Sequence, residues 1–463
     1  MSVLQDKCLG DAAAAVQSVV DACADCDTCR FLMDESCLLF PKLYQLWDHA
    51  RETGQPITEN ALLELANFCT LCGLCPCPNI RGDVIKAKAA HVKTEGMSLG
   101  GRALADIQRF ARLGGLAPRL INRLLSTAPV SRAVKSLLDI HPHRQLPRIA
   151  PESFFTWARE RGLTRRPRGA SKAAYFAGCT AGYLFPGVAK AAVGVLTHNA
   201  VTVHVPDQQC CGMPTLLEGD RPTTLRRAGT NLKTLIELGR EGYDVVCSCP
   251  TCGYLLKVLL KENACYADAY QKAVGADENE IKVPDGAAGG DGFIRVKKSM
   301  YQRILKNNGL FSELDPLERI EVSTHVQDLG EFLSGLHKEG RLNTGFGRLE
   351  GHMVYYAPCH QREQGVGSPY PELLAKIPGL EIQPIGGPMD CCGMGGSLGY
   401  KRQFHEHSIL LGNRLMAKIE AAAPTAIVTD CLSCRLQFQH RLPYRVLHPL
   451  ELLFQAYQTG NSA

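Results

Sequence analysis

The chain has 463 residues with a net charge of +5, 45% hydrophobic residues and 21% charged residues, which is ordinary for a folded protein of two to four domains. This charge is too small to indicate nucleic-acid binding. The N-terminal "MSVLQDKCLGDAAAAVQ" has an early Asp and no apolar core, and no run approaches eighteen apolar residues, so we expect neither a secretory signal peptide nor a transmembrane helix. We therefore expect a cytoplasmic protein. Its 21 cysteines would then indicate metal or redox chemistry, because reducing compartments disfavour structural disulfides.

Residues 1–95 contain two cysteine-rich runs. "CADCDTCRFLMDESC" supplies Cys23, Cys26, Cys29 and Cys37, and "CTLCGLCPCP" supplies Cys69, Cys72, Cys75 and Cys77. Cysteines spaced two residues apart point three thiolates at three corners of a cube, and the fourth corner commonly comes from the last cysteine of the other run. Eight such ligands predict two [4Fe–4S] clusters. Zinc is the alternative, but zinc is bound by cysteine pairs rather than triplets.

The two fourth ligands are the least regular part of this pattern. Seven residues separate Cys29 from Cys37, Leu38 stands where a proline is usual, and a single residue separates Cys75 from Cys77. Elsewhere in residues 1–95, the apolar spacing between the runs and the segment 79–96 predict helices. We expect a mostly α-helical domain.

Residues 96–168 contain no cysteine and predict a basic amphipathic helical linker. Two apolar faces are expected, made by Leu104, Ile107, Phe110 and Ala111 and by Leu120, Ile121, Leu124 and Leu125. The other positions carry cations: Arg102, Arg109, Arg112, Arg119, Arg123, Arg132 and Lys135. Such a stretch can lie on an anionic membrane surface, and it can equally pack on the protein's own domains or on a partner subunit. Both interpretations stay open.

Residues 169–463 alternate short apolar runs with helical patterns. We expect strands in "AAYFAGC", "VTVHVPD", "DVVCSC", "HMVYYAPC", "EIQPIGG" and "AIVTDC", and helices in "TTLRRAGTNLKTLIELG" and "QFHEHSILLGNRLMAKIEAA". This alternation predicts α/β units with mainly parallel sheets. Cys179, Cys249, Cys359 and Cys431 then fall at strand ends, on the sheet edge where open α/β sheets bind ligands.

The same half of the chain contains a duplication. Each copy reads Cys, about thirty residues, Cys-Cys-Gly, nearly forty residues, and Cys-x-x-Cys, and each cysteine of the second copy follows its counterpart by 180 to 182 residues. The first copy supplies Cys179, Cys210, Cys211, Cys249 and Cys252; the second supplies Cys359, Cys391, Cys392, Cys431 and Cys434. Cys8, Cys247 and Cys265 are left over and are interpreted as free cysteines.

Two further features lie around these motifs. "THVQDLGEFL" and "LHPLELLFQA" look like matching helix starts at His325 and His448, with a helix-entry or core role favoured for both histidines. Their spacing is shorter than that of the cysteines, so the first copy carries an insertion, in which the Gly-rich segment 283–293 is expected to be a loop.

The doubled cysteine motif resembles the cysteine-rich CCG domain of the heterodisulfide reductase B subunit. With the N-terminal runs, the whole chain resembles the iron–sulfur C subunit of anaerobic glycerol-3-phosphate dehydrogenase, the iron–sulfur subunit of glycolate oxidase and the D subunit of membrane-bound heterodisulfide reductase. The implied architecture is α+β and multi-domain: an α-helical ferredoxin-like domain over 1–95, the linker over 96–168, and duplicated α/β CCG domains with mainly parallel sheets over 169–345 and 346–463.

The resemblance also implies cofactors. Each set of five cysteines would hold a noncubane [4Fe–4S] cluster, in addition to two cubane clusters in the N-terminal domain. Gly212 and Gly393 follow the adjacent cysteines, where a glycine lets the backbone approach a cluster and donate an amide hydrogen bond to sulfur. His360, beside Cys359, is a candidate proton donor for catalysis at a bound sulfur species. A structural hydrogen bond is the alternative role for His360.

Two functions compete. The first is an electron-transfer subunit that passes electrons between a flavoprotein dehydrogenase and a quinone or membrane partner, within a hetero-oligomer located in the cytoplasm or peripherally on the membrane's inner face. No Gly-x-Gly-x-x-Gly follows a strand, which favours a relay over a complete dehydrogenase. The second is a heterodisulfide-reductase-like subunit that reduces a disulfide at noncubane clusters. A structural or zinc-binding module is disfavoured by the triplet spacing. No nucleic-acid partner is expected.

Overall fold

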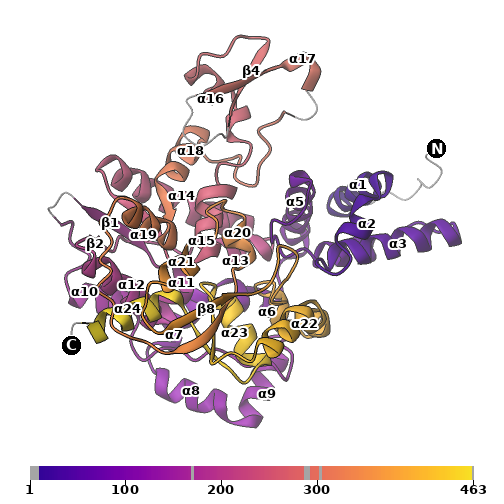
Figure 1. Ribbon diagram of the computed structural model, residues 1–463. Coiled ribbons are helices and arrows are strands. Elements are labelled where there is room, and N and C mark those ends of the chain that lie inside the picture. The colour runs from indigo at the N-terminus through magenta and orange to yellow at the C-terminus, as the bar shows by residue number, and fades with distance from the viewer. Residues whose placement is uncertain (1–9, 168–170, 286–291, 302–304, 461–463) are drawn as a thin grey trace.

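The computed structural model describes residues 10–167, 171–285, 292–301 and 305–460. Figure 1 shows an N-terminal helical lobe, a body built around two sheets, and a small hairpin that projects from the body. The expected α+β architecture with parallel sheets is confirmed, because both four-stranded sheets are parallel throughout.

Five helices form the N-terminal lobe: α1 Asp11–Cys26, α2 Thr28–Leu32, α3 Leu39–Thr53, α4 Glu59–Ala66 and α5 Pro78–Glu95. Val16, Leu43 and Leu62 are buried between them. Phe68, just beyond the end of α4, instead packs edge-on against Phe404, with ring centroids 5.0 Å apart. The lobe is therefore helical as expected. Through Phe68 it contacts Phe404 of the second cysteine-rich copy. Its ferredoxin-like character stays a prediction.

The linker forms α6 Leu99–Ala105, α7 Ile107–Gly114, α8 Pro118–Ser126, α9 Ala128–Leu137 and α10 Phe154–Glu160. The expectation that Phe110 and Ala111 share one apolar face is wrong. Asp106 leaves the helical conformation and its carboxylate caps the new helix α7 by accepting from the Arg109 N–H, at 3.1 Å. The chain is thereby reoriented: Ala111 is buried, whereas Phe110 is 51% exposed.

The first sheet has the order β2-β1-β3-β6 and the second the order β8-β7-β9-β10, so the two copies share one topology. The strands are β1 Lys172–Phe176, β2 Thr202–His204, β3 Asp244–Cys247, β6 Val326–Asp328, β7 Gly351–Tyr355, β8 Leu380–Pro384, β9 Ala426–Val428 and β10 Arg445–Leu447. All six strands expected from the sequence are present. The fourth strand of each sheet was not expected.

The helices around the first sheet are α11 Gly178–Tyr183, α12 Pro186–His198, α13 Met213–Leu217, α14 Arg221–Arg240, α15 Pro250–Gly253, the π-helix η1 Tyr254–Leu259, the short η2 Ala264–Tyr266, α16 Asp268–Ala273, α17 Lys298–Tyr301, α18 Pro316–His325 and α19 Leu329–Lys338. Those around the second are α20 Cys359–Arg362, α21 Pro369–Leu374, η3 Leu398–Tyr400, η4 Arg402–Phe404, α22 His405–Ala422, α23 Leu432–Arg441 and α24 Pro449–Gly460. The two helices expected from the sequence correspond to α14 and α22.

The insertion in the first copy contains the projecting hairpin, in which β4 Glu280–Pro284 pairs antiparallel with β5 Phe293–Lys297. The Gly-rich loop expected over 283–293 is thus bounded by strand residues at both ends, and its residues 286–291 lie outside the described part of the chain.

The expected match between His325 and His448 is wrong. His325 ends α18, whereas Asp328 caps α19 through a capping box with Glu331. His448 precedes α24 in the same way: its N–H donates to Glu451 at 2.8 Å and its Nδ1 accepts from Leu450 N–H. The equivalent of His448 is therefore Asp328, because the strands β6 and β10 each run directly into their helix.

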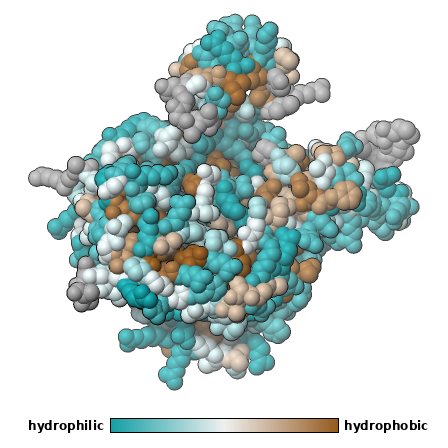
Figure 2. Space-filling view, viewed as in Figure 1, coloured by the Kyte–Doolittle hydropathy of each residue, from teal (hydrophilic) through white to brown (hydrophobic). Residues whose placement is uncertain are grey.

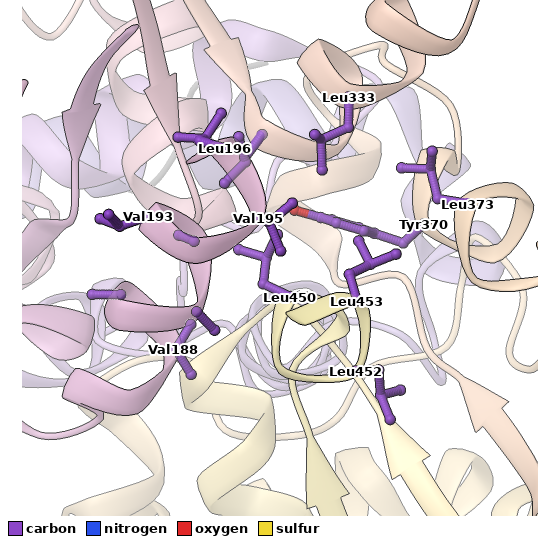
Figure 3. Close-up of a cluster of buried hydrophobic side chains, with 14 of the residues drawn as sticks. Val188, Val193, Val195, Leu196, Leu333, Tyr370, Leu373, Leu450, Leu452 and Leu453 are labelled. Carbon is purple, nitrogen blue, oxygen red and sulfur yellow. The ribbon is translucent and has the colours of Figure 1, made fainter. Parts of the chain in front are cut away.

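The two copies share one hydrophobic core. Helix α12 of the first packs on α24 of the second, and Figure 3 shows Val195 beside Leu450 and Leu453, with the Tyr370 ring alongside them. The two helices approach so closely that a Cβ at Gly194 would lie 2.2 Å from the Phe454 ring. Boundaries at 168/169 and 345/346 remain predictions, since this core crosses the second of them.

Candidate functional site

The first cysteine triplet of the N-terminal lobe gathers around the end of α1 and takes a fourth cysteine from the other run. Burial, followed by the charges of Cys29, Cys77 and Cys26, raises the pKa of Cys23 to about 12. Cys77 therefore lies beside Cys23, Cys26 and Cys29. Cys26 and Cys77 are exposed, so this group faces the surface of the lobe.

The second triplet is arranged reciprocally. Burial raises the pKa of Cys37 to about 12, with further contributions from Cys72 and Cys69. Burial likewise raises the pKa of Cys75, followed by Cys69, Cys72 and Cys37. Thiols that raise one another's pKa form a donor set suited to a metal centre, because a metal binds the thiolate form and relieves the crowding. The structure thus places Cys37 near Cys69 and Cys72, and Cys77 near Cys23 and Cys29, while their role as fourth cluster ligands stays a prediction.

All five cysteines of the first copy meet at the carboxyl edge of their sheet, after β1, β2 and β3. The Sγ atoms of Cys210 and Cys179 are 3.5 Å apart. Hydrogen bonds from Cys179 and Cys211 lower the pKa of Cys210, while Cys210 raises the pKa of both neighbours. Cys249 and Cys252 complete the set, and Cys252 is held by Cys211 and Cys249.

The second copy repeats the arrangement at its own sheet edge. The Sγ atoms of Cys434 and Cys392 are 3.1 Å apart, and hydrogen bonds from Cys391 and then Cys434 lower the pKa of Cys392. Burial raises the pKa of Cys359, and among the charged groups that follow are Cys392 and Cys431. Five clustered thiols in each copy, with lowered pKa values at Cys210 and Cys249 in the first and at Cys392 in the second, fit an iron–sulfur centre chemically, since thiolates are its ligands.

Glycines hold the backbone against both sets. Gly393 has φ +84°, its N–H donates to Cys391 Sγ at 3.3 Å, and a Cβ there would lie 2.1 Å from the Ser408 carbonyl oxygen. Gly212 has φ +105° and its N–H lowers the pKa of Cys210. Gly178, at φ +69°, was not singled out from the sequence, yet a Cβ there would lie 2.8 Å from Cys252 Sγ. Side chains are excluded where the backbone must approach sulfur.

The linker contributes a buried residue to each set, and neither was expected. Gln108 of α7 accepts the Cys210 N–H through Oε1 at 2.8 Å. Arg144 is 1% exposed; its guanidinium donates to the Gly399 carbonyl, to Gln437 Oε1 at 2.5 Å and to Ser408 Oγ at 2.7 Å. Ser408 in turn donates to the Gly393 carbonyl at 2.6 Å. Arg144 thus fixes the turn that follows Cys391 and Cys392.

The second N-terminal group adjoins the second copy. Cys72 is the charged group that most raises the pKa of Cys359 after burial. The two loops fit closely, since a Cβ at Gly395 would lie 2.7 Å from Thr70 and one at Gly73 would lie 2.4 Å from Glu363. The two copies meet in turn at buried Asp430, whose pKa is raised by burial, by Asp328 and by Cys249.

His360 lies at the junction of the three parts. Its Nε2 is 3.0 Å from the Leu71 carbonyl oxygen and its Nδ1 is 3.0 Å from Thr251 Oγ1, while the ring stacks on Tyr254 with centroids 4.7 Å apart. Because a carbonyl only accepts, Nε2 carries the proton and Nδ1 accepts from the threonine hydroxyl. Burial lowers the pKa of His360 to about 4. The imidazole is therefore neutral at pH 7 and both nitrogens are engaged.

The remaining cysteines stand apart from these sets. Cys247 is fully buried within β3, and burial raises its pKa. Burial also raises the pKa of Cys265, beside η2. Cys8 lies outside the described residues. A packing role for Cys247 agrees with its expected status as a free cysteine.

The linker also presents an apolar surface. Leu113, Leu116 and Leu120 of the α7–α8 segment are 60%, 84% and 59% exposed, respectively. Arg119 and Arg123 are exposed on the same segment. Figure 2 shows apolar patches among polar surface on the face it presents. Within the described residues, no helix has the length and apolarity needed to cross a bilayer.

Two parallel sheets, each with five cysteines gathered at its carboxyl edge, define a duplicated cysteine-rich domain. Residues 173–257 and 353–439 both match the family described as CCG, cysteine-rich domain, so the chain contains this domain twice. The match includes all ten cysteines of the two copies and ends before β6 and β10, the fourth strands of the sheets.

Curated relatives extend the likeness beyond these domains. The chain is 24% identical to the C subunit of anaerobic glycerol-3-phosphate dehydrogenase from Escherichia coli over 377 residues, which is 81% of each protein. It is 26% identical to the B subunit of fumarate reductase (CoM/CoB) from Methanothermobacter marburgensis, over 62% of this chain and 47% of that one. Lactate utilization protein A of Anoxybacillus flavithermus is 22% identical over 60% of this chain and 97% of its own length. The resemblance to the glycerol-3-phosphate dehydrogenase C subunit expected from the cysteine pattern is confirmed.

Proposed function

We propose that the chain is an iron–sulfur electron-transfer subunit that passes electrons between a flavoprotein dehydrogenase and a quinone or membrane partner. The observation that carries this proposal is the close fit of the loops around Cys72 and Cys359, where a Cβ at Gly395 would lie 2.7 Å from Thr70 and one at Gly73 would lie 2.4 Å from Glu363. This fit places the second N-terminal cysteine group beside the second cysteine-rich domain. Relatives that are named as subunits of a dehydrogenase and of a reductase support a role within a larger complex.

Each residue group has a proposed part. Cys23, Cys26, Cys29 and Cys77 would hold one cubane cluster, and Cys37, Cys69, Cys72 and Cys75 the other. The two sets of five would hold up to two noncubane clusters. Such clusters supply one-electron redox chemistry when bound. The chain's own contribution is to bury the thiolates, donate amides to sulfur from Gly212 and Gly393, and exclude water.

The groups are proposed to act in series. The exposed group with Cys26 and Cys77 would exchange electrons with the dehydrogenase, and the group with Cys72 would pass them to the second copy at Cys359. Transfer to the first copy would pass Asp430, whose pKa is raised by burial, by Asp328 and by Cys249. A relay of this kind requires that successive clusters lie close together.

The test is iron and acid-labile sulfide per chain in anaerobically purified protein. Four [4Fe–4S] centres require about sixteen irons. About eight irons would mean that the cysteine-rich domains hold no cluster, and the proposal would fail. Cys391→Ala should lower the iron content by about four and leave the N-terminal clusters' electron paramagnetic resonance signals unchanged, whereas Cys247→Ala, at a buried cysteine outside every set, should change neither.

A second candidate function is reduction of a disulfide at the cysteine-rich domains. It is favoured by the retention of all five cysteines in both copies and by likeness to a fumarate reductase subunit named for CoM and CoB. A disulfide would accept two electrons and two protons to give two thiols, with His360 as a proposed proton donor. Adding a thiol to the oxidised protein should then produce a new electron paramagnetic resonance signal, and His360→Asn should slow thiol release. Absence of the signal favours the relay.

We also propose a peripheral position on an anionic membrane surface for the α7–α8 segment. Its exposed leucines and its arginines Arg119 and Arg123 have the composition of an interfacial amphipathic helix. Arg112 does not belong to this surface set, because its Nε donates to the Tyr183 hydroxyl at 2.8 Å. Removing the exposed charges should therefore weaken binding to anionic vesicles.

A further inference from the structure

A large cleft lies where the N-terminal lobe, the linker and the first cysteine-rich domain meet. Its volume is about 1410 Å³, and its walls come from α5, from α6 and α7, and from the segment that joins α13 to α14. Ligand pockets usually enclose roughly 300–1,000 Å³. The cleft therefore has room for a ligand with a long apolar tail as well as a head group.

The lining of the cleft is amphiphilic. Leu99, Phe110, Leu113 and Leu137 line it and are 63%, 51%, 60% and 68% exposed, respectively. Cations stand among them: Lys86, Lys93, Arg102, Arg109, Arg221 and Arg226. Exposed large apolar side chains are costly unless something covers them. This lining suits a ligand with an extended apolar part and polar oxygen acceptors.

One wall of the cleft is also the wall of the first cysteine set. The face of α7 opposite Phe110 carries Gln108, whose Oε1 accepts the Cys210 N–H at 2.8 Å. On the other side of the cleft, Thr215 donates its hydroxyl to the Gly212 carbonyl at 2.8 Å, directly after the adjacent cysteines. Through Gln108 and Thr215, the elements that line the cleft are thus hydrogen-bonded to the backbone of Cys210 and Gly212.

The apolar lining continues along the chain onto the surface. Leu113 lines the cleft and is followed by Leu116, Leu120 and Leu124, which are 84%, 59% and 45% exposed on the loop before α8 and on α8 itself. An apolar path thus runs from the segment proposed to contact a bilayer to the cleft. If a bilayer covers these leucines, a lipid-soluble molecule could follow this path into the cleft.

We propose that this cleft binds a quinone with an isoprenoid tail, with the tail over Phe110 and Leu113 and the head group toward Thr215. The inference rests on the proposed relay and adds its terminal acceptor site. The quinone would take two electrons, delivered singly from the dehydrogenase side through the first cysteine set, and two protons from solvent, to leave as the quinol. The cations of the rim would stabilise negative charge on the quinone oxygens during reduction.

Binding is tested on the anaerobically purified protein with its clusters in place, in detergent. The probe is an azido-naphthoquinone with an isoprenoid tail, and labelled peptides are mapped by mass spectrometry. We expect labelling within 97–116 and 213–226. Phe110→Asp with Leu113→Asp should reduce it at least tenfold; both side chains are largely exposed, so the fold should survive. Leu410→Asp is the matched control, because Leu410 is 69% exposed on α22 and does not line the cleft.

The outcomes separate this inference from the relay. Labelling elsewhere, labelling unaffected by the double variant, or labelling displaced equally by a phospholipid or by a quinone without a tail would overturn the quinone site. Reoxidation of the dithionite-reduced protein gives the second readout: the double variant should slow reoxidation by the tailed quinone at least tenfold and leave ferricyanide reoxidation unchanged. If the cleft is labelled but no quinone reoxidises the protein, the quinone-binding site stands and the proposed electron transfer to that site is refuted.

Discussion

Replacing Arg144 by methionine should destabilise the second cysteine set more than its distance in sequence suggests. The variant keeps much of the side-chain volume but removes three hydrogen bonds from a site that is 1% exposed. The Gly399 carbonyl, Gln437 Oε1 and Ser408 Oγ each lose a charged donor. At about 1 kcal/mol for each buried acceptor left unsatisfied, the local loss is about 3 kcal/mol.

Hydrogen exchange on the intact protein is the appropriate assay, because a chain of several domains does not unfold in one step. A loss of about 3 kcal/mol corresponds to a roughly 100-fold fall in protection of the amides of 393–412. The amides of 213–240, around the first set, serve as the internal reference. Unchanged protection over 393–412 would refute the conclusion that Arg144 fixes the turn.

The variant Arg144→Lys separates the effect of the positive charge of Arg144 from the effect of its several hydrogen-bond donors. Cys392 is among the charged groups that act on the pKa of Arg144, although burial has the larger effect and lowers that pKa overall. The lysine variant should lose stability like Arg144→Met but retain the reduction potential of the centre bound at Cys391 and Cys392. Arg144→Met should shift that potential to more negative values, because a nearby positive charge favours the reduced form. Equal reduction potentials in both variants would contradict the conclusion that the charge of Arg144 raises the potential of this centre.

Three further changes test other parts of the molecule. Gly178→Ala should lower the iron content by about four per chain, because its Cβ would lie 2.8 Å from Cys252 Sγ; Gly242→Ala, at φ +78° with nothing within 4 Å, should not, and equal losses would point to backbone strain alone. Replacing exposed Arg119, Arg123 and Arg132 by Gln should weaken binding to anionic vesicles about 100-fold, at about 1 kcal/mol for each charge; the same change at Arg240, Arg295 and Arg348 is the control, and unchanged co-sedimentation would remove the membrane surface. Because His360 has a pKa lowered to about 4 by burial, the potential of the second set should have the same pH slope in wild type and His360→Asn between pH 6 and 8; a flatter slope in the variant would show that His360 exchanges protons in that range.

The sequence pattern predicted the architecture well because its physics is local. The alternation of short apolar runs with helical patterns predicted six strands and parallel sheets, and the cysteines that follow those runs indicated which sheet edge would carry the site. The strands β6 and β10 were missed because each is three residues long and runs directly into a helix, so the pattern of both segments predicts a helix start. The helices that follow these strands were aligned at the wrong residues. Asp328 and His448 occupy the same capping position but have different side chains, so His448 was matched to His325.

What the sequence could not indicate is long-range. Arg144 reaches Gly399 and Gln437 across 255 and 293 residues, and nothing in a run of arginines marks the one that becomes buried. The roles of Gln108 and Gly178 could not be predicted either, because they depend on which backbone N–H or sulfur atom another segment of the chain brings near. Asp106 broke the expected apolar face of the linker because a capping side chain competes with helix continuation.

The tight contact between α12 and α24 has a consequence for how the two halves can change. Since Gly194 admits no side chain beneath Phe454 and the valines and leucines of both helices fill one interior, a chain cut at residue 345 would leave that interior open to water. The equivalent helices α19 and α21 also pack on each other across the two copies, so each copy is constrained by its neighbour's packing.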